Sequence, residues 1–255
     1  MRRLLLGMMW GAGLLLLAAC GDASSGLDRL SAGERGKVVS VGSGDAVTLD
    51  TGLVVRLAGI DTPFADQPGG QAAQDDLTRR VNGKTVELLY GGLRRDSRGR
   101  ALAQARLTDG RVWLQGALLK DGVARVRTYA DNRAMAAAML EAEAKARIAK
   151  RGLWGQGVFS VLLPREISRS TDGFQIVEGK VLSVTAARGG TYLDFTPDHR
   201  GFAVLIAPTA LPDLQAAGKP APGLGGRLIR VRGVVGWDGL MRVDHPEQIE
   251  VLKEK

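Results

Sequence analysis

The amino-acid sequence predicts a β-rich α+β protein with two small domains, and three observations support this prediction. Much of the chain consists of short apolar runs separated by Gly, Asn or Asp turn signals, a pattern that is typical of β-strands. Residues 133–151 are rich in Ala, Met, Glu and Lys and stop at Gly152, which indicates a helix. Beyond residue 172 the apolar positions recur with a period of two, which indicates a second, mainly β domain.

The first 20 residues resemble a bacterial lipoprotein signal. Two arginines precede an apolar stretch that starts at Leu4, and small residues lead to Cys20, the single cysteine of the chain. The apolar stretch is short for a membrane span. We therefore expect a signal peptide over residues 1–20 and lipidation of Cys20, with the protein anchored in the bacterial cell envelope on its periplasmic or surface side. A plain secretory signal or an N-terminal anchor helix is the alternative.

Composition divides the remaining chain into further segments. Residues 21–34 are rich in Gly, Ser and Asp and lack periodicity, so we expect a flexible tether. A first domain is expected over residues 35–157, a linker with scattered Gly, Pro and Ser over 158–172, and a second domain over 173–253. With one cysteine no internal disulfide can form, so stability must come from the packed cores.

Strands and helices alternate in the first domain. The apolar patterns predict strands at residues 37–41, 46–50, 53–59, 84–90 and 102–107. Helical spacing predicts helices at 71–81 and 112–121, in addition to the one at 133–151.

The second domain reads as five short strands, at residues 174–184, 191–195, 203–206, 227–235 and 240–243. Residues 208–226 contain four prolines, and we expect a long connection or a partly disordered loop there. Five strands with one long connection fit a small closed barrel of the oligonucleotide-binding (OB) type. An open sandwich is the alternative.

The formal net charge of +8 is unevenly distributed. Residues 20–171 carry 23 Lys and Arg against 17 Asp and Glu, whereas residues 172–255 carry ten of each. A polyanion should therefore prefer the first domain. His199 and His245 have no cysteine partners and no ligand spacing, so we do not expect zinc. No oligomerisation signal is visible, and we expect a monomer.

Candidate site residues lie on three turns of the first domain. An apolar run that carries Arg56 ends in Asp-Thr-Pro at residues 61–63, which suggests a buried strand that delivers a cation and a carboxylate to one place. A preceding Gly-rich turn carries Asp45, and the turn at residues 96–100 carries paired arginines. Two carboxylates and two arginines on separate turns suit a divalent metal with a phosphate beside it.

These motifs resemble the staphylococcal-nuclease family over about half of the chain, from roughly residue 36 to residue 155. Gly44-Asp45 matches that family's first Asp turn, residues 56–63 match its Arg–strand–Asp-Thr-Pro segment, and residues 96–100 match its Asp-x-Tyr-Gly-Arg turn. The sequence at 151–155 looks like the end of its last helix. The resemblance implies a five-stranded OB barrel with three helices, and calcium-dependent hydrolysis of phosphodiesters in single-stranded DNA or RNA.

The resemblance also implies roles for individual residues. Asp45, Asp61 and the backbone carbonyl of Thr62 would hold Ca²⁺, which takes hard oxygen ligands. Arg56 and Arg100 would bind the scissile phosphate and neutralise the charge that builds up in the transition state.

Two departures from the family pattern bear on activity. Phe64 stands where the family has its general-base Glu, and the loss of a positioned base lowers the rate by on the order of 10²–10⁴. Asp66 is a candidate substitute if its loop is repositioned. Arg98 replaces the family's Tyr, and with Arg94 and Arg95 it forms either a set of further phosphate contacts or a solvated hairpin.

Three hypotheses follow, in this order. The first is a membrane-anchored, calcium-dependent nuclease whose activity is impaired at the base position. The second is a non-catalytic module that binds nucleic acid or protein. The third is a structural envelope protein that uses both domains for protein contacts, in which the C-terminal barrel binds a protein partner.

Overall fold

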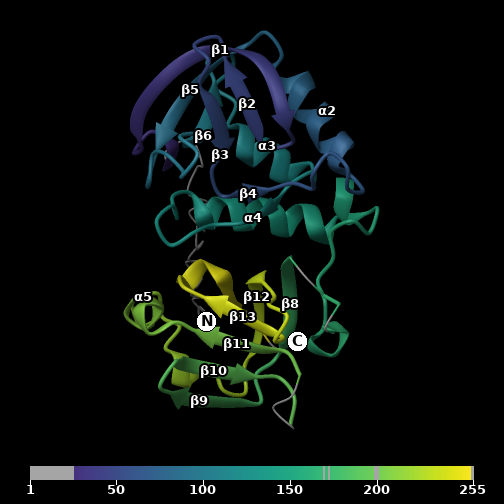
Figure 1. The fold of residues 1–255 in the computed structure, drawn as a ribbon, viewed down its shortest axis with the longest axis vertical. Coiled ribbons are helices and arrows are strands. Elements are labelled where there is room, and N and C mark those ends of the chain that lie inside the picture. The colour runs from purple at the N-terminus through teal and green to yellow at the C-terminus, as the bar shows by residue number, and fades with distance from the viewer. Residues whose placement is uncertain (1–25, 169, 172, 198–200, 254–255) are drawn as a thin grey trace, which may run out of the picture.

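The computed structural model of the chain describes residues 26–168, 170–171, 173–197 and 201–253. The expected signal peptide and Cys20 lie outside these residues. Within the described ranges, none of the helices combines the length and the apolar character that a membrane crossing requires. Two β-rich parts lie one above the other, and helix α4 (Ala136–Ile148) lies on the side of the first part that faces the second (Figure 1).

A closed five-stranded barrel forms the first part, which we call the N-terminal barrel. Its strands neighbour one another in the order β1-β2-β3-β6-β5. Their bounds are Ser31–Ser43 (β1), Ala46–Leu49 (β2), Val54–Leu57 (β3), Ala101–Leu107 (β6) and Thr85–Tyr90 (β5). Only β3 and β6 pair in parallel within this barrel. The barrel and its accompanying helices confirm the predicted fold class.

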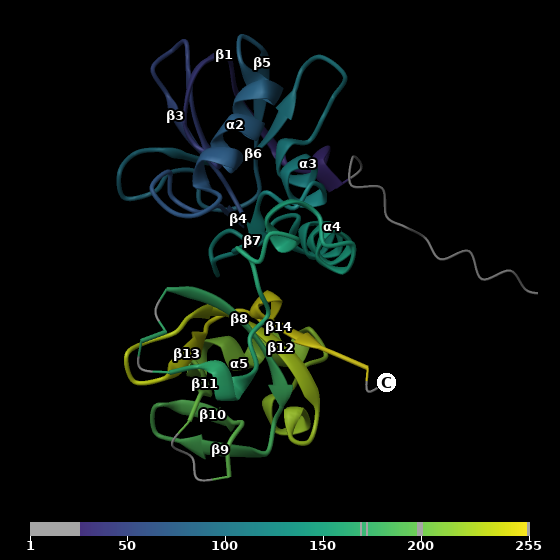
Figure 2. The ribbon, with the colours of Figure 1, turned by 90° about the vertical axis from the view of Figure 1, so that its right-hand side faces the viewer.

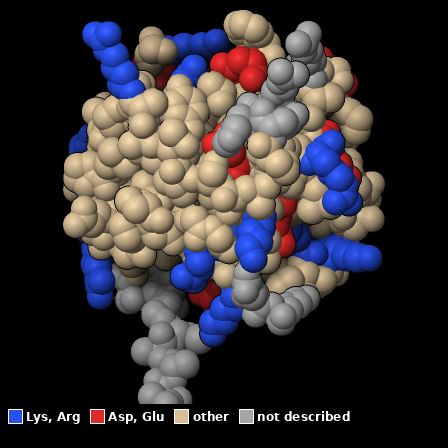
Figure 3. Space-filling view, turned by 90° about the horizontal axis from the view of Figure 1, so that it is seen from below, with Lys and Arg blue, Asp and Glu red and all other residues tan. Residues whose placement is uncertain are grey.

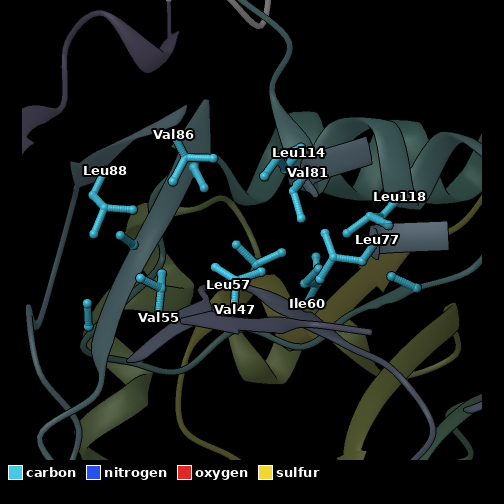
Figure 4. Packing of buried hydrophobic residues seen from close by; sticks show 14 of the residues in the cluster. Val47, Val55, Leu57, Ile60, Leu77, Val81, Val86, Leu88, Leu114 and Leu118 are labelled. Carbon is cyan, nitrogen blue, oxygen red and sulfur yellow. The ribbon is translucent and has the colours of Figure 1, made fainter. Parts of the chain in front are cut away.

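Helices α2 (Gly70–Val81), α3 (Leu114–Lys120) and α4 accompany this barrel. The core is formed by side chains from strands and helices together, as Figure 4 shows for Leu57, Leu77 and Leu118. A two-residue strand, β4 (Ile60–Asp61), pairs with β7 (Arg125–Val126) beneath the barrel. Neither was expected, because two residues are too few to show a periodicity.

The expectation of a flexible tether over residues 21–34 is partly incorrect, because residues 26–34 are packed against the barrel. Strand β1 begins at Ser31 and pairs with β5, so that Ser31 lies opposite Tyr90. Leu27 is almost fully buried, and Arg106 Nη1 donates to the Asp28 carboxylate over 2.6 Å. The composition of this segment looks flexible, but its partners lie more than 50 residues further along the chain.

Seven strands make up the second part, which we call the C-terminal barrel. They are Phe174–Lys180 (β8), Ser183–Ala187 (β9), Gly190–Asp194 (β10), Ala203–Ile206 (β11), Leu228–Val234 (β12), Leu240–Val243 (β13) and Ile249–Val251 (β14). They form a four-stranded sheet in the order β13-β11-β10-β9 and a three-stranded sheet in the order β14-β12-β8.

The pairing order of the C-terminal barrel repeats that of the N-terminal barrel. The predicted strand at 174–184 is broken into β8 and β9, which pair with β12 and β10 respectively, as β1 pairs with both β5 and β2. Strands β11 and β13 are parallel, as β3 and β6 are. A single antiparallel bridge, Val235 to Met241, joins β12 to β13. The ring of pairings therefore closes as in an OB barrel, with its last contact reduced to one bridge.

The connection at residues 208–226 is ordered, which corrects the expectation of a partly disordered loop. It contains the 3₁₀ turn η3 (Pro208–Ala210), helix α5 (Leu211–Ala216) and the 3₁₀ turn η4 (Ala221–Leu224). A proline lies in the first turn of each of the three, where a missing N–H costs nothing. The buried side chains of Leu214 and Leu224 fix the connection on the core.

The segment that joins the two barrels contacts them at Phe159 and Leu162. Phe159 is buried and contacts Trp154, with 5.3 Å between the ring centroids. Leu162 forms a parallel bridge with Val177 of β8. Seen from the side, α4 and β7 face the end of the C-terminal barrel that carries β8, β12 and β14 (Figure 2). The two barrels are thus held against each other by side-chain packing as well as by the chain itself.

Candidate active site

Asp45 lies in the tight turn between β1 and β2, where it meets an arginine from the neighbouring strand. Because Ala46 pairs with Arg56, the guanidinium of Arg56 reaches the Asp45 carboxylate, with 2.7 Å between Nη1 and Oδ2. The same nitrogen donates to the backbone carbonyl of Ile60 over 3.1 Å, and Ser43 Oγ donates to Asp45 Oδ1 over 2.7 Å. Arg56 is therefore held by both a carboxylate and the backbone.

Asp61 is paired with two arginines that the sequence analysis did not identify as site residues. Strand β7 lies opposite β4, and Arg125 Nε donates to Asp61 Oδ2 over 3.0 Å, while Arg127 Nη1 donates to Oδ1 over 3.2 Å. The available signal was the alternation Arg-Val-Arg at residues 125–127, which places both cations on one face of a short strand.

Thr62 brings the two aspartates together. Its backbone N–H donates to Asp45 Oδ2 over 3.3 Å, so the turn that carries Asp61 lies against the turn that carries Asp45. The Thr62 side chain is buried, and its Oγ1 has no hydrogen-bond partner among the described residues. An unpaired buried hydroxyl beside two carboxylates leaves one oxygen donor unused.

The oxygen donors of this cluster fit calcium in kind. Two carboxylates, the Thr62 carbonyl and a free hydroxyl are hard ligands of the type that Ca²⁺ takes, with waters completing the shell. Within the described part of the chain, no three His, Cys, Asp or Glu side chains come together as a metal site. Arg56, Arg125 and Arg127 already share the charge of Asp45 and Asp61. We therefore expect any calcium ion to be held weakly and in competition with guanidinium groups.

Arg100 is positioned by Asp96 in the turn between β5 and β6. Arg100 Nε donates to Asp96 Oδ2 over 2.7 Å, and the backbone N–H groups of Arg98 and Arg100 donate to Oδ1. Gly99 has a φ of 76°, which an L side chain adopts only with strain, and it closes the turn. Burial raises the pKa of Asp96, but these hydrogen bonds outweigh it and lower the pKa below its usual value. Asp96 thus stays ionised and holds Arg100.

Arg56 and Arg100 line one hollow of about 270 Å³, which we call the arginine hollow. It lies under the β3–β4 turn, and Arg127, Tyr129 and Asp131 also line it. Guanidinium groups that converge on a hollow of this kind can bind a phosphate through paired hydrogen bonds. The structure therefore brings both predicted phosphate arginines together and adds a third.

The other predicted phosphate contacts do not line the arginine hollow. Arg94 lies over the ring of Tyr90, with 4.7 Å from its guanidinium carbon to the ring centroid. Arg95 is ion-paired with Glu34 and donates to the Tyr90 hydroxyl over 2.8 Å, so it ties β1 to β5. Arg98 is exposed in its turn. Of the three, the structure gives Arg95 a structural role.

The position of the missing base is apolar and open. Phe64 is 71% exposed and lines a second hollow, of about 730 Å³, together with Asp61 and Arg125. Asp66 is also exposed but lines neither this hollow nor the arginine hollow. Asp131, which is not among the predicted site residues, lines the arginine hollow instead.

Residues 54–156 match the family model described as staphylococcal nuclease homologue. Thermonuclease of Staphylococcus hyicus is 30% identical over 127 residues, which cover 46% of this chain and 74% of the thermonuclease. The chain belongs to the staphylococcal nuclease family. An uncharacterised protein of Bacillus anthracis is 30% identical over 131 residues, which cover 47% of this chain and 60% of that protein.

Membership of the staphylococcal nuclease family confirms the predicted resemblance and makes the N-terminal barrel a nuclease-like domain. The family match contains Arg56, Asp61 and Arg100 and ends before β8. The C-terminal barrel therefore lies outside the matched region, and lipidation at Cys20 stays a prediction.

Proposed function

We propose that the protein binds a phosphodiester of single-stranded nucleic acid in the arginine hollow and hydrolyses it slowly with calcium. The observation that carries this proposal is that Arg56 and Arg100 line the same hollow while a carboxylate holds each of them, Asp45 and Asp96 respectively. A guanidinium that is fixed before the substrate arrives loses little freedom on binding and stabilises the developing charge effectively.

The chain's own residues have distinct roles in this proposal. Arg56 and Arg100 donate hydrogen bonds to the phosphate oxygens and neutralise the charge of the transition state. Asp45, Asp61 and the Thr62 carbonyl would hold calcium, which when bound supplies Lewis-acid stabilisation of a phosphate oxygen.

We assign to Asp131 the role of accepting the proton of the attacking water. Phe64 has no group that accepts a proton, and Asp96 is occupied by Arg100. Asp131 is the remaining carboxylate that lines the arginine hollow. The water oxygen would form the new bond to phosphorus while the bond from phosphorus to the leaving ester oxygen breaks; the water proton would pass to Asp131, and the leaving oxygen would take a proton from solvent. Because Phe64 occupies the position of the family's general base, we expect slow hydrolysis.

Hydrolysis of single-stranded DNA and RNA, with calcium and with a chelator, tests this proposal. Arg100→Ala should reduce cleavage by on the order of 10²-fold or more, because the phosphate loses a positioned cation. Arg79→Ala, which removes an exposed arginine of α2, should leave cleavage unchanged and serves as the control. Cleavage that survives both Arg56→Ala and Arg100→Ala would overturn the mechanism.

A binding function without cleavage is the second candidate. It is favoured by the exposed Phe64 and by the hydrogen bonds that both carboxylate oxygens of Asp45 and of Asp61 already accept. Phe64→Glu separates the two functions. A large gain of nuclease activity would indicate a site that lacks only its base, and binding without any gain would favour the binding module.

A further inference from the structure

The two barrels line a third hollow, which lies next to the arginine hollow. This interdomain hollow has a volume of about 400 Å³ and is lined from one side by Arg127 and Tyr129 and from the other by Phe174, Trp237 and Arg242. Arg127 and Tyr129 also line the arginine hollow. A ligand that leaves the arginine hollow past these two side chains therefore reaches a surface to which the C-terminal barrel contributes.

Trp237 is unusually placed for a tryptophan. It lies in the loop between β12 and β13 and is 88% exposed, although a side chain of this size normally buries most of its apolar surface. By pairing order, β12 and β13 are the fourth and fifth strands of the C-terminal barrel. The loop between these strands is one that OB folds use to bind oligonucleotides. The corresponding loop of the N-terminal barrel carries Arg100.

The charges in the interdomain hollow favour stacking over phosphate contacts. Arg242 is largely exposed, but Asp238 lies 3.9 Å from it, and Asp244 also lines the hollow. The rings of Tyr129 and Trp237 are both exposed, and Arg127 lies over the Tyr129 ring, with 5.6 Å from its guanidinium carbon to the ring centroid. Aromatic side chains bind bases of any sequence through their π-faces.

We next consider whether Lys and Arg side chains gather at the lower end of the C-terminal barrel, which faces away from the N-terminal barrel. In the view from below, Lys and Arg side chains lie scattered, largely towards the edge of the molecule, and do not gather into one patch (Figure 3). Among the residues that the structure describes, this face therefore shows no basic track of the kind that holds a polyanion. The interdomain hollow shares both Arg127 and Tyr129 with the arginine hollow, whereas the hollow at Phe64, which Phe174 and Val234 also line, shares Arg127 alone.

We propose that the interdomain hollow is a second subsite, which stacks one or two bases of the single-stranded nucleic acid whose phosphodiester lies in the arginine hollow. This proposal rests on the proposed function, since the first contact is the phosphate at Arg56 and Arg100. The C-terminal barrel thereby sets the length of nucleic acid that the protein prefers. A dinucleotide fills the arginine hollow, whereas a longer strand reaches Trp237 as well.

Fluorescence anisotropy with the full chain and a chelator, which suppresses cleavage, tests the subsite. The probe is a labelled single-stranded DNA of about 12 nucleotides, within the range that OB folds cover. An unlabelled dinucleotide is measured by competition. The variants are Trp237→Ala, Arg100→Ala and, as a control, Ile148→Ala, which removes an equally exposed apolar side chain at the end of α4.

Trp237→Ala should weaken binding of the long probe between about fivefold and about 100-fold, as expected for one lost stacking contact. It should leave binding of the dinucleotide unchanged. Arg100→Ala should weaken binding of both ligands, and Ile148→Ala should change neither. Because Trp237 is exposed, its removal should not shift the thermal unfolding temperature, which is checked in parallel.

Two other outcomes would overturn this subsite in distinguishable ways. If Arg100→Ala weakens binding and Trp237→Ala does not, the arginine hollow stands and the subsite is wrong. If neither variant changes the affinity for either ligand, the proposed function itself fails. A change in sedimentation of Trp237→Ala with unchanged DNA affinity would instead make the exposed ring a contact between copies of this chain.

Discussion

Arg232 of β12 lies 2.6 Å from Glu143 of α4, measured from Nη1 to Oε2, and both side chains are buried between the two barrels. Arg232 Nη1 also donates to the Val126 carbonyl, and its Nη2 donates to Glu250 over 2.6 Å. Burial lowers the pKa of Arg232, but the neighbouring carboxylates outweigh it and raise the pKa. Separation of the barrels would therefore take Arg232 away from Glu143 and leave Glu143 with the more distant Arg147, at 3.9 Å, and we expect the barrels to unfold as one unit.

Arg232→Met should strongly destabilise the whole chain. Removing one partner of a buried ion pair typically costs about 3–5 kcal/mol, and Glu143 would keep the more distant Arg147, at 3.9 Å. The double variant with Glu143→Leu should recover part of this loss, because it removes both charges. Unfolding in urea measures the difference, and Arg227→Met, at an exposed arginine, is the control. A loss below about 0.5 kcal/mol, within the range of ordinary surface substitutions, would show that the pair does not couple the barrels.

Thr128 and His245 form a second contact across this interface. The Thr128 hydroxyl lies 2.8 Å from His245 Nε2, and both residues are buried, while His245 Nδ1 faces the Asp244 carboxylate. In the tautomer that carries its proton on Nδ1, towards Asp244, Nε2 accepts a hydrogen bond from the Thr128 hydroxyl. Thr128→Val should cost about 1–3 kcal/mol, because it leaves a buried acceptor unpaired. Thr128→Ser, which keeps the hydroxyl, should cost less in the same urea experiment, and equal losses would contradict this assignment.

Glu34 makes the stability of the N-terminal barrel depend on acid. A hydrogen bond from the Tyr90 hydroxyl and the ion pair with Arg95 lower the pKa of Glu34 from 4.5 to about 2. Its contribution is therefore complete above pH 4.5 and is lost as the pH falls towards 2. Because the side chain is partly exposed, we expect at most about 1 kcal/mol.

Thermal unfolding of the wild type and Glu34→Gln measures this contribution. The two proteins should differ at neutral pH and converge near pH 2. A difference that stays constant across this pH range would show that the hydrogen-bonded carboxylate is not its source.

Arg127→Gln should strengthen calcium binding and weaken nucleic-acid binding. The substitution removes a cation from Asp61, which then has more charge to offer a metal ion, and it removes a guanidinium from the arginine hollow. Calcium affinity is measured by calorimetry without substrate, with Arg79→Gln as the control. Unchanged calcium binding in Arg127→Gln would mean that Arg127 and calcium do not compete for Asp61.

Asp131→Asn tests the assigned proton acceptor. The amide keeps the size of the side chain but accepts no proton, so hydrolysis should fall by on the order of 10²-fold or more. Asp66→Asn makes the same chemical change outside the arginine hollow and outside the hollow at Phe64, and it should leave the rate unaltered. If the loop of Asp66 moved into the site when substrate binds, Asp66→Asn would lower the rate of hydrolysis and Asp131→Asn would not, which would contradict the assignment.

Local signals in the sequence were enough to predict most strands of the N-terminal barrel and the turns of its site, while the closed barrel itself was implied by the family resemblance. The Gly-rich turn before Asp45, the Asp-Thr-Pro segment and the Asp-x-x-Gly-Arg turn each reflect backbone geometry that neighbouring residues impose. Period-two runs likewise predicted most strands of both barrels. The predicted strand at 174–184 was continuous, however, because its break between β8 and β9 comes from a change of partner strand.

What each charged side chain contacts was decided by the tertiary structure alone. Arg125 and Arg127 meet Asp61 across more than 60 residues, and Arg232 meets Glu143 across 89. The sequence by itself determined that these residues are charged and where the chain turns. It did not determine whether a given arginine lies in solvent, against a carboxylate or in a hollow. That choice depends on burial and on the approach of distant segments, because the energy of a charge depends on its surroundings as well as on its position in the chain.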